Sequence, residues 1–443
     1  MRFFYSMRKY KQYTCALLFA ICNLPFVICH SQSITNSPYS RFGLGDLQDG
    51  CFANNIPMGG IYNAMQNDTI APFNINANNP ASLASSRLTI FEFGLRSNNT
   101  QLETQSNKFF SNQTALAYMS LSFPVTKWWG ASFGLMPYSS VGYKIYDLQN
   151  VDNVGDVKYS YEGKGGINQV YFGNGFRKKN FYIGAKVSYL FGDLFYFSRD
   201  SFPAGTSYMN TKYSQTTRFN NVYYTLGAQY KQQLGKNWSA TIGATGGFQT
   251  NMVVRRTTFA ATYVNSFGVE TPKDTVIDAV DRKDTITIPL VYGFGFVLKK
   301  SDKLIIGLDY SAQNWSVFKS PGQTGIYKNS QKYAVGFQYI PNKSAGTKES
   351  YLKKIFYRAG VRYTNTSLEF NNIPLKDYAL TLGAGFPLRK IKVGETYSQS
   401  IINLGIEIGQ RGTLDQLLIR ERYINVVLGF TLNDRWFIKK KYD

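Results

Sequence analysis

The stretch I-I-N-L-G-I-E-I-G, at Ile401–Gly409, decides the fold because its residues alternate between two chemical kinds. Successive side chains of a β-strand point to opposite faces, so a period of two predicts a strand with one apolar and one polar face. The apolar face consists of Ile402, Leu404, Ile406 and Ile408, and the other face of Asn403, Gly405, Glu407 and Gly409. Soluble sandwiches and membrane barrels both use strands of this kind.

Three further features favour a membrane barrel over a soluble sandwich. Comparable segments, among them Ile288–Leu298, Leu304–Ser311 and Tyr378–Phe386, have roughly 9–13 residues, the length that a tilted strand needs to cross a bilayer. Their second face is rich in glycine and serine, as the lumen of a barrel would be. Aromatic residues gather at membrane interfaces, and four of the five tryptophans stand at segment ends, namely Trp128, Trp129, Trp238 and Trp436.

These segments predict an all-β fold, a transmembrane antiparallel β-barrel of about 14 strands. In lipid every backbone N–H and C=O group needs a partner, so the sheet must close on itself. An even number of strands places both termini on one side, the periplasmic side. Short turns alternate with long connections at 142–166, 193–218 and 249–285, which we expect to be extracellular loops. The expected strands are 87–98, 113–124, 128–141, 167–177, 180–192, 219–233, 238–248, 286–298, 303–315, 332–340, 355–368, 376–387, 400–410 and 422–433.

Residues 1–31 have the composition of a secretory signal peptide. Basic residues precede the apolar run Cys15–Cys29, and small residues flank a cleavage site before Gln32. Removal of this segment takes away the only histidine, His30, and leaves Cys51 as the only thiol. A chain without histidine lacks the Ser-His-Asp and Cys-His pairs of hydrolases. We therefore expect no enzyme activity, no metal site and no cofactor.

The charge balance is basic, with 49 Lys and Arg against 27 Asp and Glu and a net charge of +22. Such a balance can attract nucleic acid, anionic lipid or an acidic ligand. The basic residues are dispersed, apart from a block at Lys439–Lys441, and the chain is exported, so we expect no nucleic-acid partner. Outer-membrane lipid and the phosphates of lipopolysaccharide are the expected anionic partners, and plain solvated loops are the alternative.

Residues 32–86 precede the first strand and have no place in the wall. A lumen enclosed by so many strands is too wide for its own side chains to fill, since about eight strands already fill it. We expect this segment to fold inside the barrel as a plug, and residues 87–443 to form the wall. The stretch N-I-N-A-N-N-P-A-S-L-A-S-S (Asn74–Ser86) would end the plug at Asn78, Asn79 and Pro80, because Asn and Pro favour turns. The alternative is a periplasmic tail that ends in a turn.

The segment N-N-P-A-S-L-A, at Asn78–Ala84, resembles the junction between plug and barrel in the FadL-type outer-membrane transporters of hydrophobic compounds. Phe123–Ser140 is similar to the second hairpin of that family, and Gly163–Phe176, Glu407–Thr413 and Gly429–Asp443 resemble a FadL-related branch of Gram-negative barrels. The resemblance implies a fourteen-stranded barrel with an N-terminal hatch in the outer membrane of a Gram-negative bacterium. It also implies that greasy molecules leave sideways through a kinked third strand.

Met136, Pro137 and Tyr138 lie in the third expected strand. Proline cannot donate a hydrogen bond to a neighbouring strand, so Pro137 must interrupt the pairing inside a wall. Together with the resemblance, this break predicts a lateral gate from the lumen to the bilayer. The alternative is that Pro137 ends the strand and begins an extracellular loop.

Several charged residues are expected to face the lumen, namely Lys186, Asp309, Arg358, Arg362 and Glu407. A guanidinium can pair with a carboxylate through two hydrogen bonds. Arg358 or Arg362 would then bind the carboxylate of a ligand such as a fatty acid, and Lys186 is a further candidate for ligand binding. The alternative is a structural ion network in which Arg358, Arg362 and Glu407 anchor the plug.

The expected function is passive uptake of hydrophobic or amphipathic small molecules, such as long-chain fatty acids, through an outer-membrane channel. The alternative is a non-conducting barrel that serves as a subunit or shuttle of a protein secretion or outer-membrane assembly complex, with other envelope proteins as partners. A transporter needs a continuous apolar pocket between plug and wall, whereas a subunit can have a tightly packed plug.

Overall fold

The computed structural model describes residues 36–67, 72–203, 205–266, 269–320, 326–343, 349–393 and 396–435. The expected signal peptide and the basic block Lys439–Lys441 lie outside these residues. Within them, no helix is long and apolar enough to cross a membrane. The short 3-10 helices of this part are η1 (Pro38–Arg41), η2 (Ile56–Met58), η3 (Pro80–Ser85), η4 (Trp315–Val317), η5 (Tyr351–Lys354) and η6 (Asp415–Leu417).

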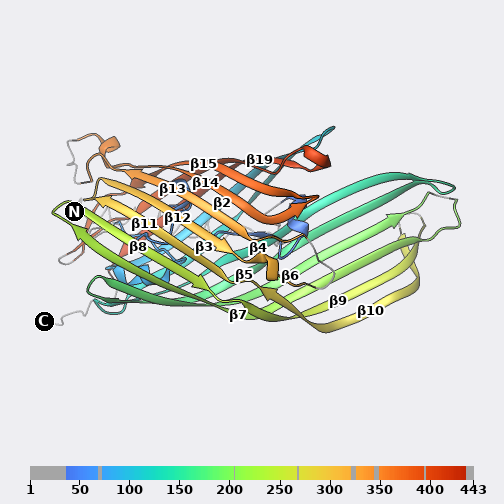
Figure 1. The fold of residues 1–443 in the computed structure, drawn as a ribbon, viewed down its shortest axis with the longest axis horizontal. Helices are drawn as coiled ribbons and strands as arrows, with labels where there is room; N and C mark the ends of the chain where they lie inside the picture. Colours follow the sequence, from blue (N-terminus) through green and yellow to red (C-terminus); the bar gives the residue numbers. More distant parts are fainter. Residues whose placement is uncertain are drawn as a thin grey trace, which may run out of the picture. The chain divides into compact units, whose positions relative to one another are not determined.

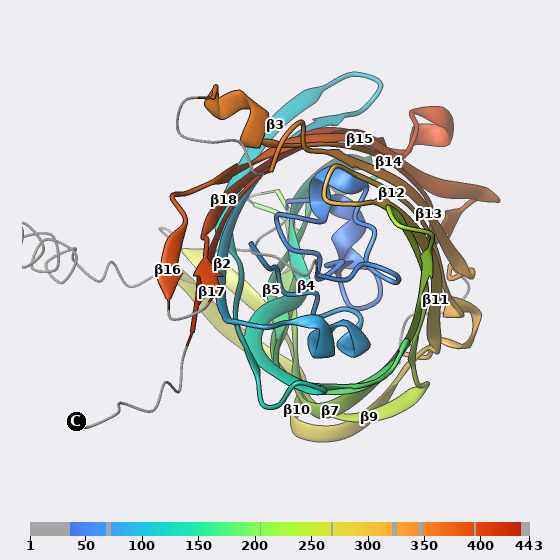
Figure 2. The same cartoon turned by 90° about the vertical axis from the view of Figure 1, so that its left-hand side faces the viewer.

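The strands form one closed antiparallel ring (Figures 1 and 2). Neighbours in the ring follow the chain, except that β8 pairs with β11, β15 pairs with β18, and β19 pairs with β2 to close the ring. In the described part of the chain the ring has fourteen strands: β2 (Thr89–Glu103), β3 (Lys108–Pro124), β4 (Trp129–Val151), β5 (Gly155–Lys178), β6 (Phe181–Ser201), β7 (Asn210–Leu234), β8 (Trp238–Gly247), β11 (Val291–Lys300), β12 (Leu304–Gln313), β13 (Ser330–Tyr339), β14 (Phe356–Phe370), β15 (Ile373–Pro387), β18 (Ile401–Arg411) and β19 (Arg420–Asp434).

Each segment that the sequence predicts as a strand overlaps one strand of this ring, so the predicted fold class is confirmed. The alternation of side chains is the physical reason. On β18, Ile406 and Ile408 are exposed on the outer face, whereas Glu407 between them is buried inside. The small strands β16 (Ile391–Val393) and β17 (Thr396–Ser398) pair only with each other and stand apart from the ring.

The connections 142–166, 193–218 and 249–285 are strand hairpins, and their expected assignment as loops is wrong. β4 and β5 stay paired as far as Val151 and Gly155, and β6 and β7 as far as Asp200 and Thr211. Within 249–285 the structure has the paired strands β9 (Thr250–Ser266) and β10 (Val269–Ile288), and β9 also pairs with β7. Two adjacent strands that leave the belt together keep their backbone groups paired, which favours continued pairing over a loop.

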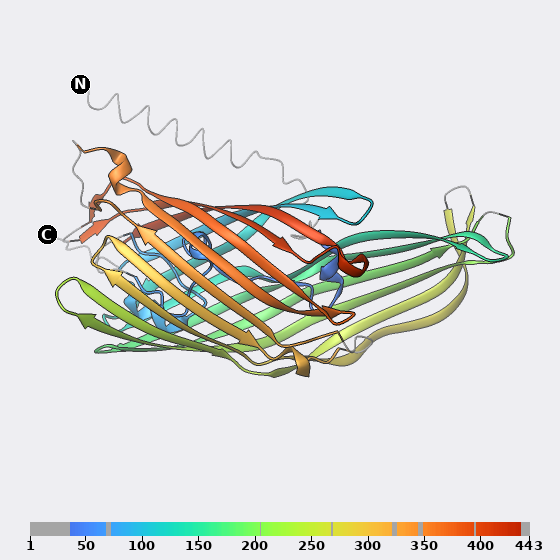
Figure 3. The same ribbon diagram turned by 45° about the horizontal axis from the view of Figure 1, so that its top comes forward.

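These hairpins build a six-stranded sheet in the order β4-β5-β6-β7-β9-β10, which we call the extension. It projects well beyond the rest of the ring at one end (Figures 1 and 3). We call this end the hairpin end. The opposite end has short connections such as 179–180 and 235–237, and we call it the turn end.

The outer surface carries an apolar belt. On β6 and β7 the exposed side chains include Ile183, Val187, Tyr189, Tyr224 and Leu226. Toward the hairpin end the outward side chains of β2 and β3 become polar: Asn112 donates to Asn99, and Thr114 donates to Ser97 at 3.0 Å. Trp129 and Trp238 begin β4 and β8 at the turn end, where an interfacial girdle would place them.

The N-terminal segment lies inside the ring (Figure 2). We call residues 36–86 the plug, of which 36–67 and 72–86 are described. Its regular elements are η1, η2, η3 and the two-residue strand β1 (Asp46–Leu47). One part of its contact with the wall is apolar: Phe52 stacks on Tyr118 of β3 with the ring centroids 3.9 Å apart, and Ala53 N–H donates to the Tyr118 hydroxyl at 2.9 Å.

The plug backbone also approaches the wall at glycines. At six of the described wall glycines a Cβ atom would come closer than 3.0 Å to a backbone atom of the plug: Gly130, Gly175, Gly184, Gly243, Gly336 and Gly360. At Gly243 of β8, for example, the obstructing atoms are the carbonyl group of Asn63. Backbone atoms cannot swing aside as a flexible side chain can. Any side chain at these positions would therefore displace the plug.

We predict that Gly243→Ala destabilises the folded barrel by about 1–3 kcal/mol, the usual cost of overpacking. Gly246→Ala, three residues further along β8, is the matched control, because its Cβ would have no neighbour closer than 4.0 Å. The measurement is the temperature at which the compact form is lost on unboiled denaturing gels. Equal melting of the two variants would contradict the close contact between plug and wall.

Candidate functional site

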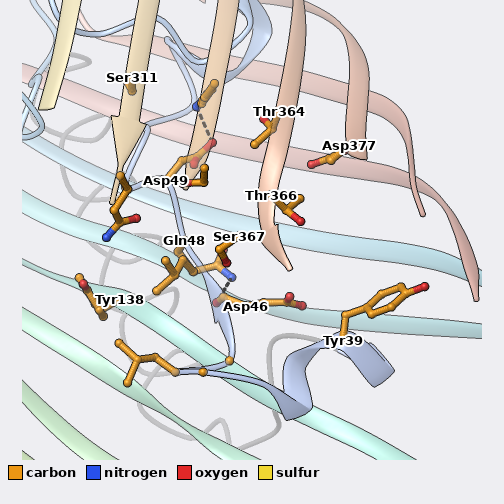
Figure 4. A pocket seen from close by; sticks show the side chains of 18 of the residues that line it. Tyr39, Asp46, Gln48, Asp49, Tyr138, Ser311, Thr364, Thr366, Ser367 and Asp377 are labelled. Atoms are coloured by element: carbon orange, nitrogen blue, oxygen red, sulfur yellow. Dashed lines mark hydrogen bonds and ion pairs between the residues drawn. The ribbon is translucent and has the colours of Figure 1, made fainter. Parts of the chain in front are cut away.

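Residues 46–49 of the plug, which we call the strap, join two arcs of the wall. On one side β1 pairs with β4 through Asp46–Ser140 and Leu47–Ser139. Gln48 N–H also donates to the Tyr138 carbonyl of β4 at 2.9 Å. On the other side, the carboxylates of the strap form ion pairs with β13, β14 and β18. Figure 4 shows Asp46, Gln48 and Asp49 in sequence along the strap.

Asp49 lies between two cations of the wall. Its Oδ2 is 2.7 Å from Lys332 Nζ and 3.2 Å from Arg362 Nη1. Arg362 also contacts Glu407 at 2.7 Å and Asp377 at 3.1 Å. Burial alone would raise the pKa of Asp49, but Lys332 and Arg362 outweigh burial and hold this pKa well below its usual range. The carboxylate of Asp49 is therefore ionised at neutral pH and ties the plug to the wall.

Arg411 of β18 makes the second ionic attachment of the plug. Its Nη1 lies 2.8 Å from Asp46 Oδ1, and its Nη2 lies 2.6 Å from Glu421 Oε2 on β19. Arg411 Nη2 also donates to Ser37 Oγ at 2.7 Å, and Ser37 Oγ donates to Glu421 Oε1 at 2.5 Å. Two separate points of the plug, Ser37 and Asp46, thus meet at one arginine.

The other lumen residues singled out in the sequence have different surroundings. Arg362 and Glu407 are paired, whereas Arg358 donates to Gln338 at 2.8 Å and to Asn403 at 2.6 Å instead. Only two of the three residues of the expected ion network are therefore joined directly. Asp309 is buried in β12 and accepts the backbone N–H groups of Tyr62 at 2.7 Å and Asn63 at 2.9 Å, so it fixes a turn of the plug.

Lys186 of β6 lines the main cavity of the lumen. This cavity, of about 450 Å³, lies between the plug and the wall, and the Lys186 Nζ is 5.7 Å from the centre of the Tyr171 ring. Figure 4 shows Tyr39, Asp46, Asp49 and Asp377 around the cavity. A pocket for a hydrophobic ligand is mainly apolar with a few polar groups. This lining instead contains many charged side chains: Asp46, Asp49, Arg96, Lys186, Lys332, Arg362, Asp377, Arg411 and Glu421.

The wall strand β4 loses its neighbour β3 partway along. The pairing of β3 with β4 ends at Met119 and Leu135, although both strands continue toward the hairpin end. We call the gap between residues 108–118 of β3 and 136–151 of β4 the seam. The β4–β5 ladder shifts register between Pro137 and Ser139, as expected where a proline interrupts a sheet. The strap pairs with β4 just beyond this point and covers the seam from inside.

The residues of the expected lateral gate lie at the start of the seam. Met136 is buried in an apolar cluster with plug residues, and Tyr138 packs edge-on against Tyr223 with the ring centroids 6.5 Å apart. Pro137 borders a cavity of about 40 Å³ between the plug and the seam. That volume holds water but no lipid-sized molecule. The described residues beside Pro137 thus leave no passage for a lipid-sized molecule, and a lateral gate stays a prediction.

Asn78, Asn79 and Pro80 precede the last turn of the plug. Asn78 Nδ2 donates to the Asp49 carbonyl at 2.7 Å, and Asn79 Oδ1 caps η3 by accepting the Ala81 N–H at 3.1 Å. Pro80 occupies the first position of η3, where its missing N–H costs no hydrogen bond. After η3 the chain leaves the interior and enters β2 at Thr89.

Sequence reasoning did not single out Asp46, Asp49 or Arg411. A weak signal was present, because the period of two on β18 places Arg411 on the same inward face as Glu407. Nothing in the sequence pairs Arg411 with an aspartate more than 360 positions away. Among the described residues, no three side chains of the His, Cys, Asp and Glu types are grouped to hold a metal ion.

The closed ring, the apolar belt and the filled lumen define an outer-membrane β-barrel with a FadL-like fold. The toluene transporter TodX of P. putida has the same architecture, with a TM-score of 0.57 and 17% identity over 88% of this chain and 100% of TodX. The Ralstonia pickettii toluene transporter TbuX gives 0.55 and 13% over 87% and 99%, and a Pseudomonas aeruginosa FadL homologue gives 0.54 and 14% over 86% and 98%. Identities this low show the fold alone. No curated protein matches the sequence.

The BamG family model matches residues 13–443, which is nearly the whole chain. The protein belongs to the BamG family. The resemblance to FadL-type proteins expected from the sequence is therefore confirmed for the fold, and the family that matches this chain is BamG.

We predict that Arg362→Gln lowers the stability of the folded protein by up to about 3 kcal/mol. Glu407, Asp377 and Asp49 lose a cation that they share, while Arg96 still pairs with Glu407 and Lys332 still pairs with Asp49. Arg422→Gln is the control, since Arg422 lies on β19 with an exposed side chain. The gel-based melting temperature of both variants measures the effect. If Arg362→Gln melted like Arg422→Gln, the ion network would contribute nothing to the attachment of the plug.

Proposed function

We propose that the protein is a non-conducting subunit of a complex that assembles proteins in the outer membrane. Membership of the BamG family supports an assembly-related role. The structural observation that carries the proposal is the attachment of the plug, which meets the wall backbone to backbone at glycines and through ion pairs at both ends of the strap. A plug held in this way keeps the lumen closed, while the outside of the barrel stays available to partners.

Passive uptake of hydrophobic or amphipathic small molecules is the second candidate. The FadL-like fold and the cavity of about 450 Å³ favour it. Against it stand the charged lining of that cavity and the small volume behind Pro137. We rank the assembly role first because the family and the contacts of the plug support the same conclusion.

We propose that the turn end faces the periplasm together with both termini, and that the hairpin end faces the cell exterior. Short periplasmic turns and longer extracellular segments are the rule in barrels of this kind. Exposed cations gather at the turn end, among them Lys178, Lys179, Lys236, Arg389 and Lys390. They suit the phosphates of lipid headgroups or the acidic surfaces of envelope proteins.

Depletion of the protein in growing cells tests the two candidates. We expect the outer-membrane levels of several unrelated barrels to fall, while the uptake of a labelled fatty acid per cell stays unchanged. We also expect the protein to co-purify with outer-membrane assembly proteins in mild detergent. Reduced uptake with normal levels of other barrels would overturn the assembly role in favour of transport.

The thiol of Cys51 reports on movement of the plug. Cys51 is partly buried, its Sγ lies 3.5 Å from Asn78 Nδ2, and burial raises the pKa of the thiol to about 12. A buried, protonated thiol reacts slowly with a maleimide. We therefore predict slow labelling of the native mature protein at pH 8, with no acceleration by added fatty acid.

Two comparisons calibrate this labelling experiment. The unfolded protein gives the maximal rate, and Asp49→Asn should label at least tenfold faster than the wild type, because Lys332 and Arg362 lose the carboxylate that holds the strap. Rapid labelling of the native protein, or acceleration by fatty acid, would favour a moving plug and hence transport.

A further inference from the structure

The extension has two edge strands among the described residues, β4 on one side and β10 on the other. An edge strand presents unpaired N–H and C=O groups and can pair with a strand of another protein. Proteins usually block such edges with charges, prolines and bulges. The two edges of the extension differ in this respect.

The β10 edge carries the protective features. It contains Pro272, and its ladder with β9 shifts register at three places. Its side chains are mostly exposed, and charged residues recur along it: Glu270, Lys273, Asp274, Asp278, Asp281, Arg282, Lys283 and Asp284. Over Val269–Ile286 this edge therefore carries what usually blocks pairing, whereas Thr287 further along β10 bridges Lys319.

The β4 edge has fewer of these features over Tyr143–Val151, where the only charged residues are Lys144 and Asp147. The segment contains no proline, and its ladder with β5 runs without a register shift from Ser139 to Val151. Its sequence is Y-K-I-Y-D-L-Q-N-V, in which Tyr143, Ile145, Tyr146 and Val151 are types that favour β-structure. Tyr146 is 54% exposed and Leu148 is 66% exposed, although both lie on a solvent-facing edge.

Half of the backbone N–H and C=O groups of Tyr143–Val151 point away from β5 and can pair with an added strand. Gly142 directs its backbone groups away from β5, because its carbonyl accepts from Ser37 N–H at 2.7 Å and its N–H donates to Ser40 Oγ at 3.0 Å. Alternate residues of a strand direct their backbone groups to the same edge. Lys144, Tyr146, Leu148 and Asn150 therefore face the seam, where their backbone groups find no partner in the described part of the chain.

A neighbouring part of the same β4 edge already pairs with a strand. β1 of the strap pairs with Ser139 and Ser140, so the β4 backbone beside Tyr143–Val151 is already oriented for pairing with an added strand. A strand placed next to Tyr143–Val151 would continue this line toward the hairpin end. Phe109 and Phe110, near the start of β3 across the seam, are 59% and 64% exposed and add apolar surface there.

We propose that Tyr143–Val151 of β4 is a docking edge for an extended strand of another protein in the assembly complex. Side chains that lie opposite one another in paired strands are in contact. The side chains of Tyr143–Val151 therefore favour particular residue types in the strand that docks beside them. Lys144 and Lys158 lie 5.4 Å and 4.7 Å from the centre of the Tyr146 ring and favour an acidic residue opposite Lys144. Leu148 favours an apolar residue opposite it. This inference rests on the proposed function, since it supplies the contact by which the subunit joins its complex.

Hydrogen–deuterium exchange tests the docking edge directly. The purified subunit is compared with the complex isolated in mild detergent, using peptides that cover 143–151 and, as an internal control, 269–286 of β10. In the complex we expect the amides of Lys144, Tyr146, Leu148 and Asn150 to exchange at least tenfold more slowly, because each gains a hydrogen bond. The β10 peptide should exchange equally in both samples.

A matched pair of variants separates backbone pairing from side-chain contact. Tyr146→Pro removes the N–H that faces the seam without removing a bond to β5, whereas Tyr146→Val shortens the side chain and keeps that N–H. We expect Tyr146→Pro to reduce the recovery of the complex at least tenfold, and Tyr146→Val to leave it within twofold of wild type. Unboiled gels verify that both variants still form compact barrels.

The outcomes distinguish this inference from the proposed function. A complex that forms without protection of 143–151, or that tolerates Tyr146→Pro, overturns the docking edge and leaves the assembly role intact. Failure to recover any complex overturns both. Protection that appears in the purified subunit alone and increases with its concentration identifies a second copy as the occupant, and overturns docking of a different protein.

Discussion

The need of every backbone N–H and C=O group for a partner governs this structure. It requires the ring to close, and β19 closes it on β2. Where β3 departs from β4, the same need explains the strap, whose short strand takes the place of the missing neighbour at Ser139 and Ser140. The plug is thus a structural part of the wall as well as the filling of the lumen. The plug and the barrel share one sheet and are not separable parts.

The lumen shows how charge and close packing act together. Glycines in the wall let the plug backbone come close enough to exclude water. The carboxylates of the strap then meet arginine and lysine beside the lumen cavity. Glu407 and Glu421, the buried carboxylates of these groups, depend on the same arginines, so removal of one arginine affects several contacts together. These contacts suit a closed barrel that works through its outer surface better than a channel that must open.

The strands were predictable because their side chains alternate within one segment, as on β18, and because the belt requires apolar residues on one face. The extension was not, because beyond the belt both faces meet water and the alternation no longer separates strand from loop. The lumen charges were partly predictable: the inward positions of Arg362 and Glu407 follow from their spacing. Their plug partners, Asp46 and Asp49, were not, since only the folded ring brings distant segments together.

The contacts of Ser37 and Asp46 carry a consequence for the order of folding. Both residues stand near the start of the described chain, yet their partners Arg411 and Glu421 belong to the last two strands of the described ring. This leading segment must therefore wait for the final hairpin before its attachments exist. The barrel therefore closes and the N-terminal segment becomes fixed in one concerted step. A later release of the leading segment would have to loosen its contacts with β19, the strand that joins the sheet to itself by pairing with β2.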